Sequence, residues 1–348
     1  MKKVNILQLV TGLGMGEAEK VVLDLAKYIS NEQFNTIIVG MSKRDELYQE
    51  FLNNKIDTKL LNKSNSLKDM FYIINTINKL IKEKEIQIIH AHMTHSIIVA
   101  SILKVLNPSL KIIFTSHSLN IGSKLREYLV WILKPLRNVD IVFSKDILKY
   151  FYKKDYKIIP NGIKIDKYNL NLSKNKKFTF IAVGRLETVK NHKFLLEIAN
   201  ELKDEFDFEI QIVGHGYLEE ELENLIQKYD LNEYVKLLGL RNDISELLNQ
   251  SHCLLMPSLW EGLPIVILEA GASNLPIIAT PVGSIPSLLN DENAYLVELN
   301  EFKNIMIEVL NNYENAKLKG KKLFENIKVK YSIEAVIEAH ENIYRELP

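Results

Sequence analysis

The sequence predicts an α/β protein built from two Rossmann-like domains. Two series of short apolar runs alternate with amphipathic stretches, and this alternation is typical of parallel sheets covered by helices on both faces. A polar segment rich in Asn and Lys, at residues 165–177, separates the two series and marks the expected domain break. A length of 348 residues fits two domains of roughly 100–200 residues each.

The predicted strands fall on both sides of the polar segment. The first series comprises residues 4–10, 36–39, 86–90, 111–116, 141–144 and 157–160. The second series comprises residues 178–183, 208–213, 234–238, 252–256, 276–279 and 294–297. The predicted helices are residues 17–29, 67–82, 96–106, 192–202, 218–229, 301–310 and 332–347. We therefore expect domains at residues 1–168 and 169–330, followed by a C-terminal helix at residues 331–348.

Charge is distributed unevenly along the chain. Residues 1–172 contain 26 Lys and Arg but 16 Asp and Glu, a formal charge of +10, so the remainder carries −10 and the whole chain zero. This asymmetry indicates that the first half faces an anionic partner or surface. Chance in a Lys-rich sequence is the alternative explanation.

Composition excludes several classes of protein. Hydrophobic residues make up 47% of the chain and charged residues 25%, values that exclude disorder and collagen-like order. A single cysteine, Cys253, excludes a disulfide framework. The sequence contains no apolar run of about 18 residues, so no membrane-spanning helix is expected. The apolar run at residues 4–10 passes into a Gly-rich segment and predicts a strand rather than a signal peptide.

Several histidines also attract attention. His90 and His92 share one face of a predicted strand, but no nearby Asp, Glu or Cys completes a zinc-ligand spacing, so we predict no metal site. His117 follows the predicted strand at 111–116, at the sheet edge where ligands bind. It is either a site residue or a hydrogen-bonded polar group of the interior.

Glycine-containing turns follow two of the predicted strands. Gly14 and Gly16 have G-x-G-x-G spacing, which differs from the dinucleotide pattern G-x-G-x-x-G. Gly214 and Gly216 flank His215 after the strand at 208–213. Such glycines either let the backbone approach a ligand closely or simply form a tight turn.

Charged side chains follow two further strands. Arg185 and Lys190 come after the strand at 178–183 and could converge on a diphosphate, although solvated surface charges are the alternative. Glu261 precedes a predicted helix and Glu269 lies about one turn inside it. Amides at the start of that helix attract an anion, and the two carboxylates would accept hydrogen bonds from sugar hydroxyls. An acidic helix cap with a buried Glu is the alternative.

Together these segments resemble the retaining group 1 glycosyltransferases of the GT-B fold, which form glycosyltransferase family 4. The resemblance rests on five stretches in the family's order. They are Gly14-Met15-Gly16 with Ala18-Glu19, Ile159-Pro160-Asn161-Gly162-Ile163, Gly184-Arg185-Leu186 with Lys190-Asn191, Gly214-His215-Gly216, and Glu261-Gly262-Leu263-Pro264 with Glu269-Ala270. The resemblance implies two Rossmann-like domains facing each other across a cleft, with the C-terminal helix returning toward the first.

The resemblance also implies residue roles. His117, Arg185, Lys190 and Glu261 would be catalytic, with the two cations on the donor's diphosphate, Glu261 on the donor sugar and His117 near its C6 side. The implied donor-binding residues are Gly14, Gly16, Gly214, Gly262, Leu263, Ile265, Val266 and Glu269, the last on the ribose hydroxyls. No cofactor and no metal are implied.

The expected function is therefore retaining, metal-independent transfer of a sugar from a nucleotide-sugar, a UDP-sugar, to a glycan or lipid-linked glycan. The expected context is polysaccharide, lipopolysaccharide or glycolipid synthesis. The family usually has a further Gly where this chain has Glu17, and this departure motivates an alternative, a catalytically silent nucleotide-sugar binder or scaffold. A nicotinamide-dependent dehydrogenase is disfavoured by the glycine spacing.

The acceptor is expected at the basic N-terminal half. Within residues 123–137, Leu125, Leu129, Ile132 and Leu136 share a face near Trp131 and among basic residues, a pattern typical of a helix lying on an anionic membrane. An ordinary amphipathic helix facing its own sheet is the alternative. We expect a cytoplasmic protein, peripheral on the inner face of the membrane. Nucleic acid is not an expected partner, because no binding module for it is evident.

Overall fold

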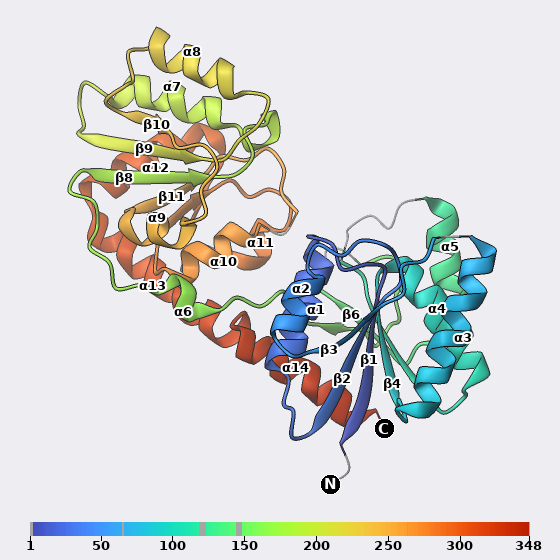
Figure 1. Cartoon of the computed structure of the whole chain (residues 1–348). Helices are drawn as coiled ribbons and strands as arrows, with labels where there is room; N and C mark the ends of the chain where they lie inside the picture. Colours follow the sequence, from blue (N-terminus) through green and yellow to red (C-terminus); the bar gives the residue numbers. More distant parts are fainter. Residues whose placement is uncertain (1–2, 65, 118–122, 144–147, 263, 348) are drawn as a thin grey trace. The chain divides into compact units, whose positions relative to one another are not determined.

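The chain divides into two compact units, which Figure 1 shows in a computed structural model describing residues 3–64, 66–117, 123–143, 148–262 and 264–347. Unit 1 comprises Met1–Gly162 and Ile333–Pro348, and unit 2 comprises Ile163–Ser332. Each unit is an α/β domain with its own hydrophobic clusters, as the alternation of strand and helix patterns predicts.

Unit 1 contains a seven-stranded parallel sheet with the order β3-β2-β1-β4-β5-β6-β7. Its strands are β1 (Val4–Val10), β2 (Phe34–Gly40), β3 (Asp57–Leu60), β4 (Ile88–His92), β5 (Lys111–Thr115), β6 (Val139–Val142) and β7 (Lys157–Ile158). The edge strand β3 is not among the predicted strands, because its alternate side chains are exposed and no apolar run marks it. Chain order reverses between β1 and β4, and the carboxyl ends of strands at such a switch point form the usual ligand site.

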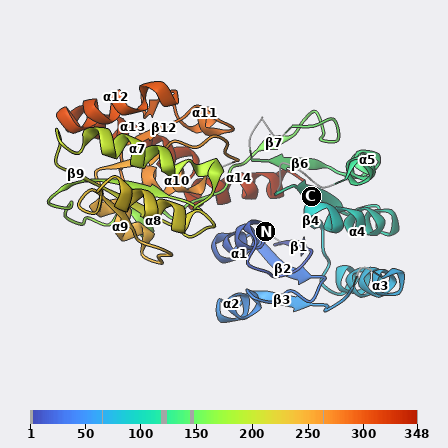
Figure 2. The ribbon, with the colours of Figure 1, turned by 90° about the horizontal axis from the view of Figure 1, so that it is seen from above.

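Helices cover both faces of this sheet (Figures 1 and 2). Alternate residues of β1 point to opposite faces. Leu7 and Leu9 pack on the side of α3 (Leu67–Glu83), α4 (Met93–Leu106) and α5 (Lys124–Ile132), and Ile6 packs on the side of α14 (Ile333–Glu346). The helices α1 (Glu17–Tyr28) and α2 (Tyr48–Asn53) share the second side.

The C-terminal helix α14 belongs to unit 1, although the preceding helix α13 (Tyr313–Lys330) belongs to unit 2. Tyr344 of α14 is fully buried and packs edge-on against Phe34 of β2, with 5.8 Å between the ring centroids. Glu341 Oε1 accepts a hydrogen bond from the backbone N–H of Ser30 at 2.7 Å. The predicted return of this helix to the first domain is confirmed.

Unit 2 contains a six-stranded parallel sheet with the order β10-β9-β8-β11-β12-β13. Its strands are β8 (Phe178–Val183), β9 (Phe208–Val213), β10 (Val235–Leu237), β11 (Cys253–Met256), β12 (Ile277–Ala279) and β13 (Tyr295–Leu296). One face carries α7 (His192–Leu202), α8 (Glu219–Lys228) and α12 (Leu299–Asn311). The other carries α6 (Ile165–Tyr168), α9 (Ile244–Gln250), α10 (Ile265–Ala272), α11 (Ile285–Leu288) and α13. Chain order reverses between β8 and β11, so this pair forms the switch point of unit 2.

The division between the units lies at Gly162, earlier than the break expected at residue 168. The reason is α6, which the polar composition of this segment conceals. Its Tyr168 is buried in the core of unit 2, and the backbone N–H of Ile163 is bonded to the carbonyl of Tyr331 at 2.7 Å. None of the described helices has the length and apolar character needed to span a bilayer.

Candidate active site

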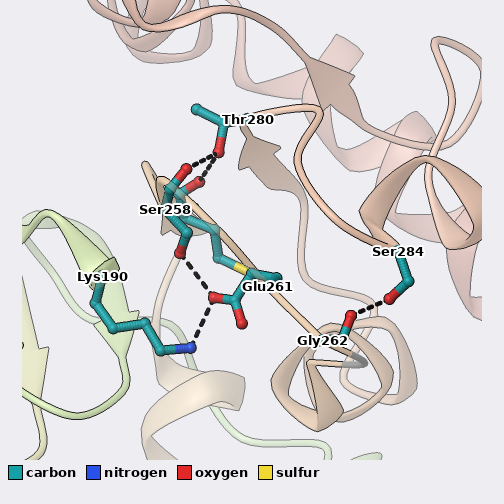
Figure 3. Close-up of polar contacts among 7 residues, drawn as sticks. Lys190, Ser258, Glu261, Gly262, Thr280 and Ser284 are labelled. Atoms are coloured by element: carbon teal, nitrogen blue, oxygen red, sulfur yellow. Dashed lines mark hydrogen bonds and ion pairs between the residues drawn. The ribbon is translucent and has the colours of Figure 1, made fainter. Parts of the chain in front are cut away.

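The charged residues singled out in unit 2 lie at its switch point. Lys190 follows β8, and Glu261 lies in the connection from β11 to α10. Because β8 and β11 are neighbouring parallel strands, their carboxyl ends bring these two connections together. Lys190 Nζ donates to Glu261 Oε1 at 2.6 Å (Figure 3). The predicted cation and carboxylate therefore form one ion pair at the expected edge of the sheet.

The carboxylate of Glu261 is almost fully enclosed. Its side chain is 6% exposed, and Ser258 Oγ donates to the same Oε1 at 2.7 Å. Thr280, which follows β12, donates to the carbonyl of Ser258 at 2.6 Å (Figure 3). Since a buried charge is tolerated only when it is paired and hydrogen-bonded, these contacts fix the position of the carboxylate. Sequence reasoning assigned no role to Ser258 or Thr280.

The loop after β12 also holds Glu261 through the backbone. Gly283 has a φ of +58°, and a Cβ there would overlap the backbone carbonyl of Glu261. The hydroxyl of Ser284 donates to the carbonyl of Gly262. Only a glycine at position 283 allows this loop to approach the backbone of Glu261 so closely. The signal in the sequence is the single Gly of the turn at 281–284. No local pattern identifies its partner, Glu261, which lies 22 residues earlier.

The aliphatic part of the Lys190 side chain packs on Gly184. A Cβ at Gly184 would lie 3.4 Å from Cδ and Cε of Lys190. The next residue, Asn191, has a left-handed backbone conformation with a φ of +56°. Its side-chain amide donates to the carbonyl of Pro257 at 3.1 Å. The next residue, His192, is buried, and burial together with the charge of Lys190 lowers its pKa to about 4. His192 is therefore neutral beside the lysine.

Arg185 does not join this ion pair. Its guanidinium donates to Glu187 Oε1 at 2.6 Å, and 72% of its side chain is exposed. The structure thus places the two expected diphosphate cations in separate ion pairs. Arg185 still occupies the first turn after β8, on the same connection as Lys190.

The glycine turn after β9 packs against the turn after β8. Gly214 has a φ of +146°, and a Cβ there would overlap the carbonyl of Gly184. A Cβ on Gly216 would meet the carbonyl of Leu186. His215 pairs with Glu219 at 2.5 Å on the surface. Both glycines are thus required by contact between the two turns, which is one of the two explanations left open by the sequence.

The second carboxylate, Glu269, lies on α10 and is half-buried. Tyr168 on α6 donates to Glu269 Oε1 at 2.6 Å. The helix begins at Ile265, after Pro264, so that Ile265 and Val266 fall in its first turn, where backbone N–H groups have no partner within the helix. Gly262 precedes them, and the predicted donor-binding residue Leu263 lies outside the described residues.

In unit 1, Gly14 and Gly16 lie between β1 and α1, at the switch point of that sheet. Packing requires a glycine at the nearby Gly12, where a Cβ would lie 2.5 Å from Ser42 Oγ and 2.9 Å from Arg44 Cβ. At Gly14 a Cβ would meet nothing closer than 3.4 Å. The interior of unit 1 therefore does not explain why position 14 is a glycine.

His117 follows β5 and is 9% exposed. Its Nε2 lies 2.8 Å from Nδ1 of His92, and among the described residues its Nδ1 has no hydrogen-bond partner. Burial, followed by the neighbouring His340, lowers its pKa to about 3, so the ring is neutral. The described residues include no group of three or more His, Cys, Asp or Glu arranged to hold a metal.

Comparison with known proteins identifies the chain. The family of glycosyl transferases group 1 matches residues 165–323, and glycosyltransferase family 4 matches residues 18–167. An uncharacterised glycosyltransferase of Haemophilus influenzae is 28% identical, over 99% of this chain and 100% of that protein. The UDP-Gal:α-D-GlcNAc-diphosphoundecaprenol α-1,3-galactosyltransferase of Escherichia coli is also 28% identical, over 88% of this chain and 86% of its own.

The fold of the whole chain also has a match. The structure of Anabaena HepE in complex with UDP has a TM-score of 0.80 at 17% identity, covering 99% of this chain and 100% of HepE. This likeness and the two parallel α/β sheets confirm the GT-B fold that the sequence predicts. The two family matches run in succession along the chain and meet near residue 165. The chain therefore belongs to the group 1 glycosyltransferases of glycosyltransferase family 4.

Proposed function

We propose that this glycosyltransferase moves a sugar from a UDP-sugar to a lipid-linked glycan, with retention of anomeric configuration and without a metal. The observation that carries the proposal is the ion pair of Lys190 and Glu261 at the switch point of unit 2. A cation and a buried carboxylate at this edge match the two ends of a nucleotide-sugar, because its diphosphate is anionic and its sugar offers hydroxyl donors.

Each partner has a role once the donor binds. Lys190 turns to the diphosphate, and Arg185, exposed on the same connection, joins it from its pair with Glu187. Glu261 then accepts hydrogen bonds from the sugar hydroxyls, held in place by Ser258. The first-turn amides of α10 and Gly262 face the phosphates, and Glu269 accepts from the ribose hydroxyls.

The reaction breaks the bond between sugar C1 and the phosphate oxygen, and the electron pair leaves with the diphosphate. The acceptor hydroxyl forms its bond to C1 on the same face, and its proton passes to the departing phosphate. Positive charge develops on the sugar and negative charge on the diphosphate. Fixed cations and amides aimed at that negative charge supply the main stabilisation, so the proposed mechanism assigns no step to a metal.

The donor and acceptor classes rest on the relatives. The Escherichia coli relative is named for UDP-Gal and a diphosphoundecaprenol-linked sugar, and HepE binds UDP. The alternative of a catalytically silent binder is not favoured, because both sequence relatives are named as glycosyltransferases. Glu17, which motivated that alternative, is the first residue of α1.

An exposed apolar surface on α5 supports a lipid-linked acceptor. Val130 is the only buried residue of this helix. Its exposed apolar side chains are Leu125, Tyr128, Leu129, Trp131 and Ile132. Leu125, Leu129 and Ile132 are therefore not the side chains by which this helix packs on its own sheet. Apolar and aromatic side chains beside Lys124 and Arg126 suit the surface of an anionic bilayer.

Transfer from a panel of UDP-sugars to an undecaprenyl-diphosphate-linked sugar, assayed with and without EDTA, tests the proposal. We expect product whose anomeric configuration equals that of the donor, at the same rate in both conditions. Binding of UDP without any transfer or hydrolysis of a UDP-sugar would contradict it. Loss of activity in EDTA, restored by Mg²⁺ or Mn²⁺, would contradict the metal-free mechanism alone.

A further inference from the structure

A continuous chain of buried hydrogen bonds crosses unit 1 from α14 to His117. His117 Nε2 lies 2.8 Å from His92 Nδ1, and His92 Nε2 lies 2.8 Å from Gln8 Oε1. Gln8 Nε2 donates to the hydroxyl of Tyr344 at 3.0 Å, and that hydroxyl lies 2.7 Å from Nδ1 of His90. Gln8 is on β1, the two inner histidines are on β4, and Tyr344 is on α14.

This chain of hydrogen bonds has no contact with solvent along most of its length. Gln8, His90, His92 and Tyr344 are all 0% exposed. At its far end, His90 Nε2 lies 2.7 Å from Thr115 Oγ1 on β5. Buried polar groups must be hydrogen-bonded, but apolar side chains would fill this space at lower cost. A row of five polar side chains inside a sheet–helix interface is therefore a feature that folding alone does not require.

The donors and acceptors of the chain run in one direction. Gln8 Oε1 can only accept, so the proton of His92 is on Nε2. Burial lowers the pKa of His92 well below its ordinary value, so this ring is neutral and its Nδ1 accepts from Nε2–H of His117. His117 is neutral too, and its Nδ1 carries a lone pair.

The hydrogen bonds from Gln8 to Thr115 are consistent with this direction. Gln8 Nε2 donates a hydrogen bond to the oxygen of Tyr344. The hydroxyl proton of Tyr344 is therefore free to be donated to Nδ1 of His90. His90 then donates from Nε2 to Thr115. The side-chain amide of Gln8 sets the direction, because its oxygen can only accept a hydrogen bond and its nitrogen can only donate one. Tyr344 accepts from the nitrogen. If the amide turned over, the proton of every ring would move to the other nitrogen.

We propose that Tyr344 and Gln8 are positioning residues, which hold His117 in the Nε2–H tautomer so that its Nδ1 remains an acceptor for a substrate hydroxyl at the carboxyl edge of the sheet of unit 1. The role of Nδ1 rests on the proposed function, whereas the tautomer does not. The C-terminal helix thus contributes to the site of unit 1 through Tyr344, which is linked to His117 by way of Gln8 and His92.

The test uses the full-length protein with 15N-labelled histidine, because 15N chemical shifts distinguish the two nitrogens of a neutral ring. In the wild type at pH 7.5 we expect His117 to be protonated on Nε2. Tyr344→Phe removes only the hydroxyl, and we expect a mixture of tautomers at His117. Gln8→Met removes the acceptor of His92 and keeps the test informative if Tyr344→Phe does not fold.

The matched control is Tyr295→Phe in unit 2. Tyr295 is 7% exposed and its hydroxyl also takes part in a hydrogen bond, accepting from Asn315 at 3.4 Å. This control should leave both the tautomer of His117 and the rate of transfer at wild-type values. In Tyr344→Phe we expect kcat to fall about tenfold, comparable to losing one hydrogen bond, with little change in the KM for the donor.

The outcomes separate the inference from the function it rests on. An Nδ1–H tautomer in the wild type, or an unchanged tautomer and kcat in both Tyr344→Phe and Gln8→Met, would overturn the positioning role. A wild type that transfers no sugar, while Tyr344→Phe still changes the tautomer, would overturn the proposed function and support the positioning of His117 by α14.

Discussion

Lys190 Nζ lies 2.6 Å from Oε1 of Glu261, although 71 residues separate them in the sequence. The two side chains meet because β8 and β11, which precede them, are adjacent at the point where the strand order of unit 2 reverses. Glu261 is the better enclosed of the two, at 6% exposed against 20% for Lys190. The lysine is therefore the partner that can turn toward a ligand, while the carboxylate stays fixed.

Removal of either partner should abolish most of the activity. We expect Lys190→Ala and Glu261→Gln each to lower kcat by about two orders of magnitude, because each removes a group aimed at charge or hydroxyls of the transition state. Glu261→Gln keeps the shape of the side chain and so limits the loss of folding. Steady-state kinetics with the UDP-sugar donor measures the effect.

The control for the lysine is Lys193→Ala. Lys193 lies on α7 and pairs with Glu221 on the surface, with about half of each side chain exposed. A surface pair of this kind contributes little, and kcat should remain at the wild-type value. Wild-type kinetics in both Lys190→Ala and Glu261→Gln would remove the ion pair from the mechanism.

Gly283 offers a test of how the backbone holds Glu261. Gly283→Ala should lower both stability and kcat, because its Cβ would overlap the carbonyl of Glu261 and displace the carboxylate. The matched control is Gly239→Ala. Gly239 has a φ of +62°, close to the +58° of Gly283, but a Cβ there meets nothing within 4 Å.

Both variants thus have the same backbone strain, about 1 kcal/mol, and only one has the overlap. Thermal denaturation and the kcat of each variant measure the difference. We expect Gly239→Ala to lose a little stability and no activity. Equal losses in the two variants would mean that the contact with Glu261 is unimportant.

The sequence predicts the frame of this site better than its interior. Strand–helix alternation locates β8 and β11, and charged residues after their carboxyl ends indicate Lys190 and Glu261. Parallel pairing then follows from the general rules for such sheets. The contacts of Thr280 and Gly283 depend on a third strand, β12, whose loop is brought in only by the tertiary fold.

Other differences have equally local causes. Arg185 was expected beside Lys190, but the sequence does not reveal that Glu187 pairs with its guanidinium. The chain of hydrogen bonds from Tyr344 to His117 joins residues that are far apart in the sequence. Gln8 and Tyr344 are separated by 336 positions, and no spacing pattern predicts such a contact. The face of α5 was identified correctly as apolar, yet periodicity does not tell whether such a face meets the sheet or the solvent.

Acid should destabilise the protein through its buried histidines. Burial lowers the pKa of His117 to about 3 and that of His340 to about 4, and lowers those of His90 and His92 well below the ordinary value. In the unfolded chain these rings titrate near pH ~6.5. Between pH ~6.5 and ~4 the unfolded state therefore binds protons that the folded state does not, and stability falls as the pH falls.

Each such histidine should cost about 1.4 kcal/mol of unfolding free energy between pH ~7.5 and ~5.5. Urea denaturation followed by circular dichroism at both pH values measures this loss. His340→Phe should reduce the pH dependence by about the share of one histidine. The control is Tyr295→Phe, which keeps all eight histidines, and it should leave the pH dependence unchanged. A pH-independent stability over this interval would contradict the neutral, buried state of these rings.

Binding to anionic lipid should depend on α5. The exposed Leu125 and Trp131 are available for burial in the bilayer interface, at 67% and 45% exposed. Burying a large apolar side chain contributes about 1.5–3 kcal/mol, so Leu125→Ser combined with Trp131→Ser should weaken co-sedimentation with phosphatidylglycerol vesicles by more than about tenfold. Because both side chains are exposed, the double variant should fold as the wild type does.

The control for the loss of an exposed leucine is Leu318→Ser on α13 of unit 2, which is 62% exposed and lies on a helix outside this patch. Its binding to vesicles should equal that of the wild type. Raising the salt concentration should also weaken wild-type binding, since the attraction between lysines or arginines and anionic headgroups is screened within a Debye length. If the double variant and the wild type sediment equally with anionic vesicles, α5 is not the surface that meets the membrane, and the lipid-linked acceptor must be reached by another face of unit 1.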